Sequence, residues 1–227
     1  MLENSDGALY DVADRAIASN GSGYAVAWSQ YDGSTYSVYT NIYSGGAWTI
    51  PVALDNSLNS AIQVTAASDG SGYAIAWQQG TGLVHDINAS LYSAGAWSAP
   101  ILLDNGASDA QTPSAAQFPT GYAVAWHQDD ASENPNIFGS IHAGGVWSTP
   151  PAAIVQGVWK GSGMLPKMAT NRSGVSLAVW PEYHKDVWRV FGSVNGSGTW
   201  GTPFLIDTDT TNEVAVATNG TSFMILW

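Results

Sequence analysis

The stretch GYAVAWSQ, residues 23–30, decides the fold because the chain writes it three times. GYAIAWQQ occupies residues 72–79 and GYAVAWHQ occupies residues 121–128, so each copy begins 49 residues after the one before. Within each copy large and small apolar side chains alternate, as they do in a strand that is packed on both faces. A fixed period of this length predicts that one small β-sheet is built several times over.

A second tryptophan motif shares the period. GAWTIP, GAWSAP, GVWSTP and GTWGTP contain Trp48, Trp97, Trp147 and Trp200. One unit then predicts four strands, at residues 60–68, 73–79, 85–93 and 96–104, joined by turns rich in Gly and Asp. The fourth strand contains Pro100, which cannot donate to a ladder and belongs at a sheet edge. Four antiparallel strands in each unit predict an all-β fold, a β-propeller, with one unit per blade.

The units divide a single predicted propeller domain, residues 1–227, into segments 12–55, 60–104, 110–154, 164–207 and a partial 211–227. We favour a ring of five blades with an incomplete last blade, which residues 8–12 would supplement. Two alternatives stay open. The chain is a fragment of a larger ring, or the open edge near Trp227 pairs with a second copy to form a homodimer, since an uncovered edge invites association.

Charge and composition exclude several classes of partner. The chain has 18 acidic and six basic residues, a net charge of -12, which disfavours nucleic acid and an anionic membrane surface. It has no Cys, so disulfides and thiolate metal sites are excluded. Its first 12 residues do not read as a signal peptide, and it has no apolar run of about 18 residues. The acidic surface favours an extracellular or cell-surface location.

The first unit contains, in this order, an inner strand, GYAVAW, a strand ending near IYS, and GGAW. This order resembles bacterial propeller repeats related to the Asp-box repeats of sialidases. It is also similar to the repeats of bacterial propeller lectins, and the resemblance covers essentially the whole chain. The Asp-box reads Ser-x-Asp-x-Gly-x-x-Trp, whereas the hairpins here read SGGAW, SAGAW, AGGVW and NGSGTW, without the Asp. Sialidases hold the substrate carboxylate with three arginines, and this chain has only Arg15, Arg172 and Arg189. The resemblance therefore implies the fold and does not imply sialidase activity.

The repeated Trp-x-Gln is the first candidate binding feature. An aromatic face can stack on a sugar while a neighbouring amide binds its hydroxyls. The alternative is that the tryptophans are inter-blade core and the glutamines cap the strand ends. The residues concerned are Trp28 and Gln30, Trp77 and Gln79, Trp126 and Gln128, and in the fourth unit Trp180 and Glu182.

The fourth unit breaks the pattern and is the second candidate. An insertion occupies residues 154–166, and five of the six basic residues lie between Lys160 and Arg189. Glu182, His184 and Arg189 follow, and a Glu and a His in one cleft can act as an acid–base pair. The alternative is an exposed loop with compensating charges.

Acidic residues elsewhere raise two further possibilities. The segment DTDTTNE, residues 207–213, could hold calcium, but it lacks the ligand spacing of a calcium loop, so we expect no metal or other cofactor. A glycosidase would need a carboxyl pair, either Asp14 with Glu213 or Glu182 with Asp186. Because no catalytic motif is evident, the sequence predicts a lectin-like, carbohydrate-binding module with no catalytic residues, not an enzyme. The alternative is a structural or protein-interaction propeller.

Overall fold

The computed structural model describes residues 11–55, 59–106, 108–118, 121–130, 134–149, 151–155, 165–184, 186–196, 198–208 and 212–227. Within these ranges the secondary structure is β-strand and no helix could cross a membrane. The strands of the first sheet are β1 (Val12–Ser19), β2 (Tyr24–Tyr31), β3 (Tyr36–Ser44), β4 (Ala47–Trp48) and β5 (Val52–Ala53). Those of the second are β6 (Ser60–Ser68), β7 (Tyr73–Thr81), β8 (Val84–Ser93), β9 (Ala96–Trp97) and β10 (Ile101–Leu102).

The remaining strands form three more antiparallel sheets. The third sheet has β11 (Ala110–Phe118), β12 (Gly121–Asp129), β13 (Pro135–Ala143), β14 (Val146–Trp147) and β15 (Ala152–Val155). The fourth has β16 (Lys167–Thr170), β17 (Ser176–His184), β18 (Val187–Asn195) and β19 (Phe204–Thr208). The fifth has two strands, β20 (Ala215–Thr218) and β21 (Phe223–Leu226).

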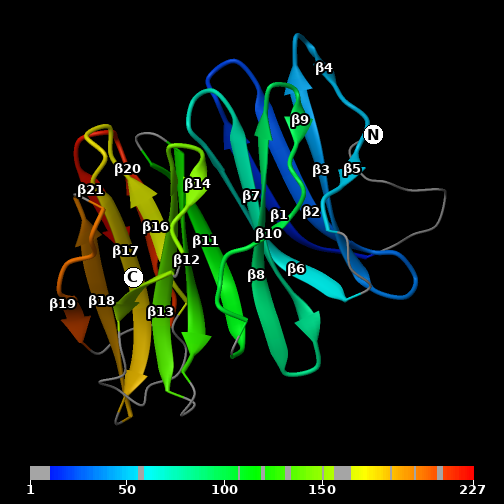
Figure 1. The fold of residues 1–227 in the computed structure, drawn as a ribbon. Coiled ribbons are helices and arrows are strands. Elements are labelled where there is room, and N and C mark those ends of the chain that lie inside the picture. Colours follow the sequence, from blue (N-terminus) through cyan, green and yellow to red (C-terminus); the bar gives the residue numbers. More distant parts are fainter. Residues whose placement is uncertain are drawn as a thin grey trace.

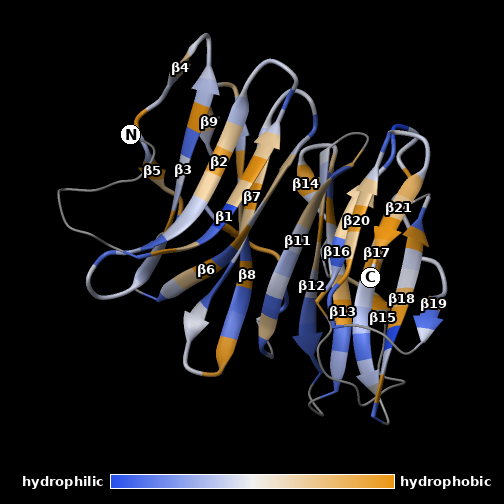
Figure 2. Ribbon diagram, turned by 180° about the vertical axis from the view of Figure 1, so that it is seen from behind, coloured by the Kyte–Doolittle hydropathy of each residue, from blue (hydrophilic) through white to orange (hydrophobic). Residues whose placement is uncertain are grey.

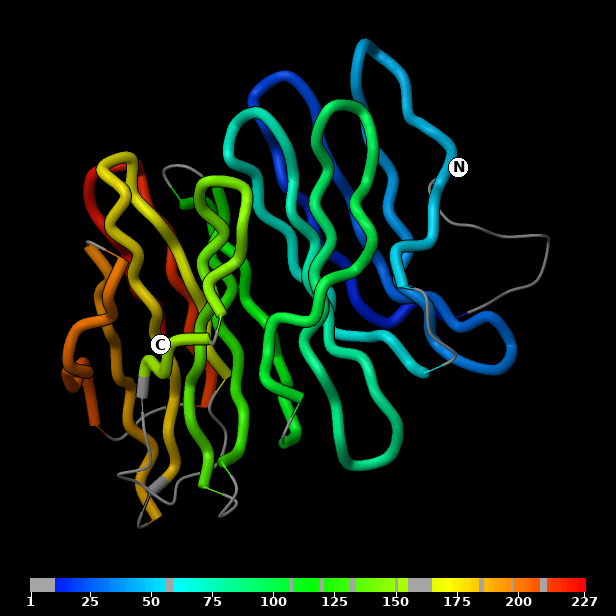
Figure 3. The backbone as a smooth tube through the Cα atoms, viewed as in Figure 1, coloured from blue at the N-terminus to red at the C-terminus, as the bar shows by residue number. Residues whose placement is uncertain are grey.

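The sheets stand side by side in chain order, with the first sheet at the right of Figure 1 and the fourth and fifth at the left. Figure 3 shows the chain passing from one sheet to the next without crossing back. The first strand of each sheet packs on the first strand of the next, so β1, β6, β11, β16 and β20 are the inner strands. This arrangement confirms the predicted all-β propeller of four-stranded antiparallel blades, and five sheets fit the predicted five blades.

The two ends of the series are not packed together. Among the described residues, no strand of the first sheet packs extensively on β20 or β21. Val12 pairs with Gln30 inside the first sheet, so this end of the predicted supplementary segment extends the first blade and not the last. The rest of that segment, residues 8–10, lies outside the described residues.

The predicted fourth strand is broken in two. In the second sheet β9 and β10 both pair with β8, and the residues between them include Pro100. The first sheet repeats the break at Pro51, between β4 and β5. Proline has no N–H to donate to the ladder, and so the edge strand is interrupted where the sequence analysis expected it to continue.

The repeated glycine of GYAVAW is required by the close approach of the neighbouring strand. A Cβ on Gly23 would lie 2.3 Å from the carbonyl oxygen of Tyr43, and one on Gly72 would lie 2.4 Å from that of Tyr92. Contacts this short do not occur for a real Cβ, so only glycine fits. Glycine at the start of each copy of the motif therefore allows the second and third strands of that sheet to pair along their full length.

Successive sheets pack a large face on a small one. Ala27 of the first sheet lies in one buried cluster with Ile75 and Trp77 of the second. The second and third sheets repeat this contact, with Ala74 and Ala76 packed among Tyr122, Val124 and Trp126. The alternation read from the sequence is thus the means by which one blade accepts the next.

The alternation ends in the last two sheets. Leu177 and Val179 occupy positions that hold alanine in the first three sheets, and they pack on the fifth sheet. Met224 and Leu226 occupy the same positions of the fifth sheet, where they are 68% and 65% exposed. At the other end Tyr24 is 45% exposed, against 2% for its equivalent Tyr73. Within the described part of the chain, the two outermost faces of the series are therefore apolar and expose large side chains.

Enlarging a buried small-face residue should destabilise the fold. Ala76 is fully buried between the second and third sheets, so Ala76→Leu forces these sheets apart. We expect a loss of about 1–3 kcal/mol in the free energy of unfolding, measured by urea denaturation. Ala217→Leu, on the exposed face of β20, is the matched control and should change it by less than about 0.5 kcal/mol. Equal effects of the two variants would contradict the packing described here.

Candidate functional site

The Trp-x-Gln residues of the first three sheets form an internal hydrogen bond. The indole Nε1 of each tryptophan donates to Oε1 of the glutamine two residues later, and all six side chains are buried. The Nε1–Oε1 distances are 3.1 Å for Trp28–Gln30, 3.0 Å for Trp77–Gln79 and 3.2 Å for Trp126–Gln128.

This placement corrects the expected role of the tryptophans. A ring stacks on a sugar only if one of its faces is open to solvent. Trp77 and Trp126 are 0% exposed and lie between neighbouring sheets. Trp77 and Trp126 therefore offer no stacking surface, whereas Trp28 is 6% exposed and lines a groove on the first sheet. The glutamines satisfy the indole N–H groups of all three. The sequence is consistent with this role too, since alternation alone accounts for the large residue.

The fourth sheet keeps the spacing and loses the hydrogen bond. Trp180 and Glu182 are buried, and neither the indole Nε1 of Trp180 nor Oε1 of Glu182 has a hydrogen-bond partner. Burial raises the pKa of the Glu182 carboxyl, and the charge of Arg189, its partner across the β17–β18 ladder, acts in the opposite direction. A buried carboxyl with a free oxygen is a costly replacement for the glutamine of the other sheets.

Of the other residues singled out in the fourth unit, Arg189 lies opposite Glu182 in the ladder and Asp186 lies at the hairpin. Asp186 is exposed at the β17–β18 hairpin, where its Oδ1 accepts a hydrogen bond of 3.3 Å from the hydroxyl of Tyr183. Arg189 is half-buried on β18, and the side chain of His184 lies outside the described residues. Whether Glu182, His184 or Arg189 binds a ligand stays a prediction.

The inner strands carry a different polar group of residues at a repeated irregularity. The β1–β2, β6–β7 and β11–β12 ladders each slip by a β-bulge at the same point of the repeat. Bulges re-aim side chains and are frequent beside functional sites. The inner polar row is defined here as the residues at these bulges and beside them on the second strands. It consists of Asp14, Gln63 and Thr112 with Ser29, Gln78 and His127.

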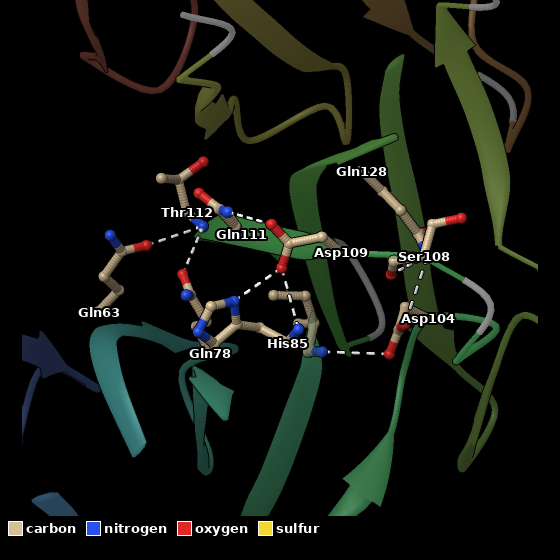
Figure 4. Close-up of polar contacts among 10 residues, drawn as sticks. Gln63, Gln78, His85, Asp104, Ser108, Asp109, Gln111, Thr112 and Gln128 are labelled. Atoms are coloured by element: carbon tan, nitrogen blue, oxygen red, sulfur yellow. Dashed lines mark hydrogen bonds and ion pairs between the residues drawn. The ribbon is translucent and has the colours of Figure 1, made fainter. Parts of the chain in front are cut away.

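Hydrogen bonds join the row from sheet to sheet. The backbone N–H of Gln63 donates to Oδ2 of Asp14 at 2.7 Å, and the backbone N–H of Thr112 donates to Oε1 of Gln63 at 2.9 Å (Figure 4). Gln63 and Thr112 both have a φ of 54°, in the left-handed region. A β-branched residue in that region is strained, so the bulge at Thr112 is held against a local cost on the order of 1 kcal/mol.

The hydrogen bonds along the inner polar row end at the third sheet. Oγ1 of Thr112 is buried without a hydrogen-bond partner, and so is Nε2 of His127, which pairs across the ladder with Gln111. His127 Nε2 lies 3.2 Å from a carboxylate oxygen of Asp129 but forms no well-aligned hydrogen bond. Burial lowers the pKa of His127, and the charges of Asp129 and Asp109 oppose that shift.

A histidine–carboxylate contact borders the end of the row. Oδ1 of Asp109 lies 2.7 Å from Nδ1 of His85 and accepts a hydrogen bond of 2.9 Å from the backbone N–H of His85. Gln111 donates to the other oxygen of Asp109 (Figure 4). These residues and the hydrophilic end of β12 seen in Figure 2 make this end of the third sheet polar, in contrast to the apolar middle of the sheets.

Sequence reasoning singled out only Asp14 from the inner polar row. Gln63 and Thr112 follow it at the 49-residue period, but the three residues differ in type and no motif connects them. The available signal was that the three residues occupy the same position of the repeat. This signal can be interpreted only in the structure, where all three lie at bulges of the inner strands.

The carboxyl groups considered for other chemistry are not assembled. Asp14 is held by Ser29 and Gln63, whereas Glu213 is exposed ahead of β20, which does not pack on β1. Within the described part of the chain, no three His, Asp or Glu side chains gather as metal ligands. Asp207, at the start of the segment considered for calcium, accepts a hydrogen bond of 2.6 Å from Nε1 of Trp227, and residues 209–211 lie outside the described residues.

Solved structures with this fold include sugar-processing proteins. The chain superimposes on a sialidase from Trypanosoma rangeli in complex with 2,3-difluorosialic acid, with a TM-score of 0.57 and 11% identity, over 96% of this chain and 43% of that one. A putative TolB from Agrobacterium tumefaciens superimposes with a TM-score of 0.52 and 14% identity, over 91% of this chain and 69% of that one. The catalytic domain of a GH62 α-L-arabinofuranosidase from Coprinopsis cinerea superimposes with a TM-score of 0.50 and 11% identity, over 89% of this chain and 71% of that one. No sequence-family model and no curated protein sequence matches the chain.

These likenesses establish the propeller fold and correct one expectation. The sequence analysis expected no enzyme because no catalytic motif was evident. Two of the superimposed structures are named as a sialidase and an arabinofuranosidase, so the same fold carries hydrolases. The expectation is overturned, because a missing motif is no argument against catalysis on this fold. The chain spans less than half of the sialidase.

Restoring glutamine at position 182 should stabilise the fourth sheet. Glu182→Gln supplies a neutral carbonyl oxygen to the unpartnered Trp180 and removes a buried carboxylate. We expect a gain of about 1 kcal/mol in the free energy of unfolding at pH 8. The folded-state pKa of Glu182 is raised, so the stability contributed by this group is fully present below the ordinary pKa of 4.5 and is lost as pH rises through the raised value. The advantage of the variant should therefore shrink on acidification, whereas Gln79→Glu should destabilise at pH 8. A gain that is independent of pH would contradict this assignment.

Titration of His127 should make stability depend on pH in the opposite sense. Its folded-state pKa lies below the ordinary 6.5, so the stability linked to this group is present above pH 6.5 and is lost as pH falls through the folded value. His127→Gln introduces the residue found at the equivalent position 78 and removes this titration. Urea unfolding between pH 7.5 and pH 5 should show a smaller loss for the variant. Parallel pH curves for the two proteins would show that His127 is not the responsible group.

Proposed function

We propose that the protein is a carbohydrate-binding propeller and that the inner polar row is its binding site. One observation carries the proposal. The row ends at Thr112, whose Oγ1 is buried and without a hydrogen-bond partner among the described residues, beside the half-buried His127. Native proteins rarely leave such atoms unsatisfied, so we expect a water, an ion or a ligand group to contact this one.

The chemistry of the row suits hydroxyl groups. The side chains of Asp14, Gln63 and Thr112 are half-buried on the inner strands, and they include carboxylate, amide and hydroxyl groups. Such groups donate to and accept from sugar hydroxyls. Their positions are fixed by backbone hydrogen bonds between sheets, so little side-chain order has to be gained on binding. The sialidase and the arabinofuranosidase among the superimposed structures add support for a sugar as the ligand.

A protein partner is the second candidate, favoured by the uncovered face of the first sheet. That face carries an apolar groove of about 630 Å³ whose lining includes Val12, Ile17 and Trp28. Exposed apolar surface of this kind is typical of interaction sites. Homodimerisation through the edge of β21 near Trp227 and an extracellular or cell-surface location stay predictions.

Removal of the Thr112 hydroxyl should abolish most of the sugar binding. Thr112→Val keeps the β-branched shape and the backbone N–H that donates to Gln63, and it deletes only Oγ1. In an isothermal titration against a panel of neutral mono- and oligosaccharides, the sugar that binds wild-type protein should bind the variant at least about 10-fold more weakly.

The control is Thr112→Ser, which retains the hydroxyl and should retain most of the affinity. Thermal unfolding of both variants tests that each is folded. Wild-type affinity in the valine variant, or no binding of any sugar in the panel to wild-type protein, would overturn the proposal.

A further inference from the structure

A polar pocket lies at the opposite end of the inner strands from the bulges. Its volume is about 450 Å³, and its lining comes from the ends of β11, β16 and β20 and from the turns that follow β16 and β20. The lining side chains include Gln117, Thr170, Arg172, Thr218 and Asn219. Three different sheets contribute to it, so it exists only in the assembled propeller.

Two turns dock to hold Arg172 in the lining. The backbone N–H of Arg172 donates to the carbonyl oxygen of Gly220 at 2.9 Å, and Nδ2 of Asn171 donates to that of Thr221 at 3.4 Å. The side chain of Arg172 then runs across Gly220, where an added Cβ would lie 2.7 Å from its Nε. Gly220 has a φ of 96° and no side chain, and it thereby makes room for the arginine.

Among the residues that the structure describes, the guanidinium of Arg172 has no acidic partner. The chain has 18 acidic residues, yet no carboxylate of the described residues forms an ion pair with this arginine, and its side chain donates no hydrogen bond to them. Beside it, the side-chain amide of Gln117 and Nδ2 of Asn219 also donate to none of the described residues. The lining therefore places a positive group and two amide groups, all exposed to solvent, around one pocket.

This cluster differs from the corresponding turns of the first two sheets. There the turns read SNGSG and SDGSG, at residues 19–23 and 68–72, without a basic residue. In the fourth sheet the turn reads TNRSG at residues 170–174 and includes the arginine. The first strand position that follows is Ser176, where the second and third sheets have Tyr73 and Tyr122. At this end the fourth sheet therefore has both a basic residue in its turn and a serine where the second and third sheets have tyrosine.

We propose that this pocket binds a carboxylate-bearing sugar residue of the uronic acid class. The planar guanidinium matches a carboxylate through two parallel hydrogen bonds, an interaction stronger than one between neutral groups. The amides of Gln117 and Asn219 and the hydroxyl groups of Thr170 and Thr218 suit the ring hydroxyls. A pocket of 450 Å³ is within the range that holds a small ligand.

This site is separate from the inner polar row, so the protein would bind an acidic saccharide at one end of the inner strands and a neutral one at the other. The surrounding net charge of -12 opposes the approach of an anion. Binding should therefore depend on the short-range pairing with Arg172, because long-range attraction is not available to draw the anion in.

The test is titration calorimetry of the whole chain with methyl β-glucuronide, methyl β-glucoside and acetate. We expect the glucuronide to bind at least about 10-fold more tightly than either of the other two, because each of them lacks one half of the recognised chemistry. Arg172→Gln should weaken glucuronide binding at least about 10-fold, and Arg172→Lys should weaken it less, since the charge stays and the paired geometry is lost. Arg15→Gln, on the first sheet, is the control that removes an equal charge elsewhere and should leave binding unchanged.

The outcomes separate this proposal from the one for the inner polar row. Glucuronide binding that survives Thr112→Val and is lost in Arg172→Gln supports the pocket, whether or not neutral sugars bind. Equal affinities for the glucuronide and the glucoside, equal affinities for the glucuronide and acetate, or wild-type affinity in Arg172→Gln would each overturn it.

Discussion

The packing of one sheet's large face on the small face of the sheet before it is the contact on which the rest of this structure depends. Two sheets that both presented large residues would be held apart, and two that both presented alanine would leave a void. In the first two sheets Ala25 and Ala27 or their equivalents meet tyrosine, isoleucine or valine, and tryptophan of the next sheet. The glycine that opens each copy permits the second strand to approach the third closely enough for this contact to repeat.

Burial of the tryptophans has a chemical consequence. Each buried indole N–H needs an acceptor, and a glutamine two residues later supplies it in the first three sheets. The motif that first suggested sugar binding is therefore part of the packing. In the fourth sheet Glu182 replaces the glutamine, and a carboxyl with a raised pKa remains inside the sheet. The repeat is relaxed there at a cost in stability, as is common where a scaffold departs from its own pattern.

Both candidate sites lie where the symmetry of the repeat runs out. Hydrogen bonds pass along the inner polar row from Asp14 to Gln63 and from Gln63 to Thr112, and they leave the last hydroxyl unused. At the far end of the inner strands, Arg172 enters a turn that has no basic residue in the first two sheets. A perfectly regular repeat would satisfy each polar group with the next copy of itself. The irregular positions are the ones left with polar groups to offer to a ligand.

The period of 49 residues, the alternation of GYAVAW and the prolines near the edge were enough to derive the propeller, because strand pairing and packing periodicity are local properties written in order along the chain. The sequence by itself also located the unusual fourth unit. Only the tertiary structure decided that Trp77 and Trp126 are inaccessible, since the same large residue serves equally well as core or as stacking surface. Likewise, Thr112 and Arg172 belong to no motif. Their surroundings come from bulges and turns of other sheets, and contacts between segments about 50 residues apart are set by how the sheets pack.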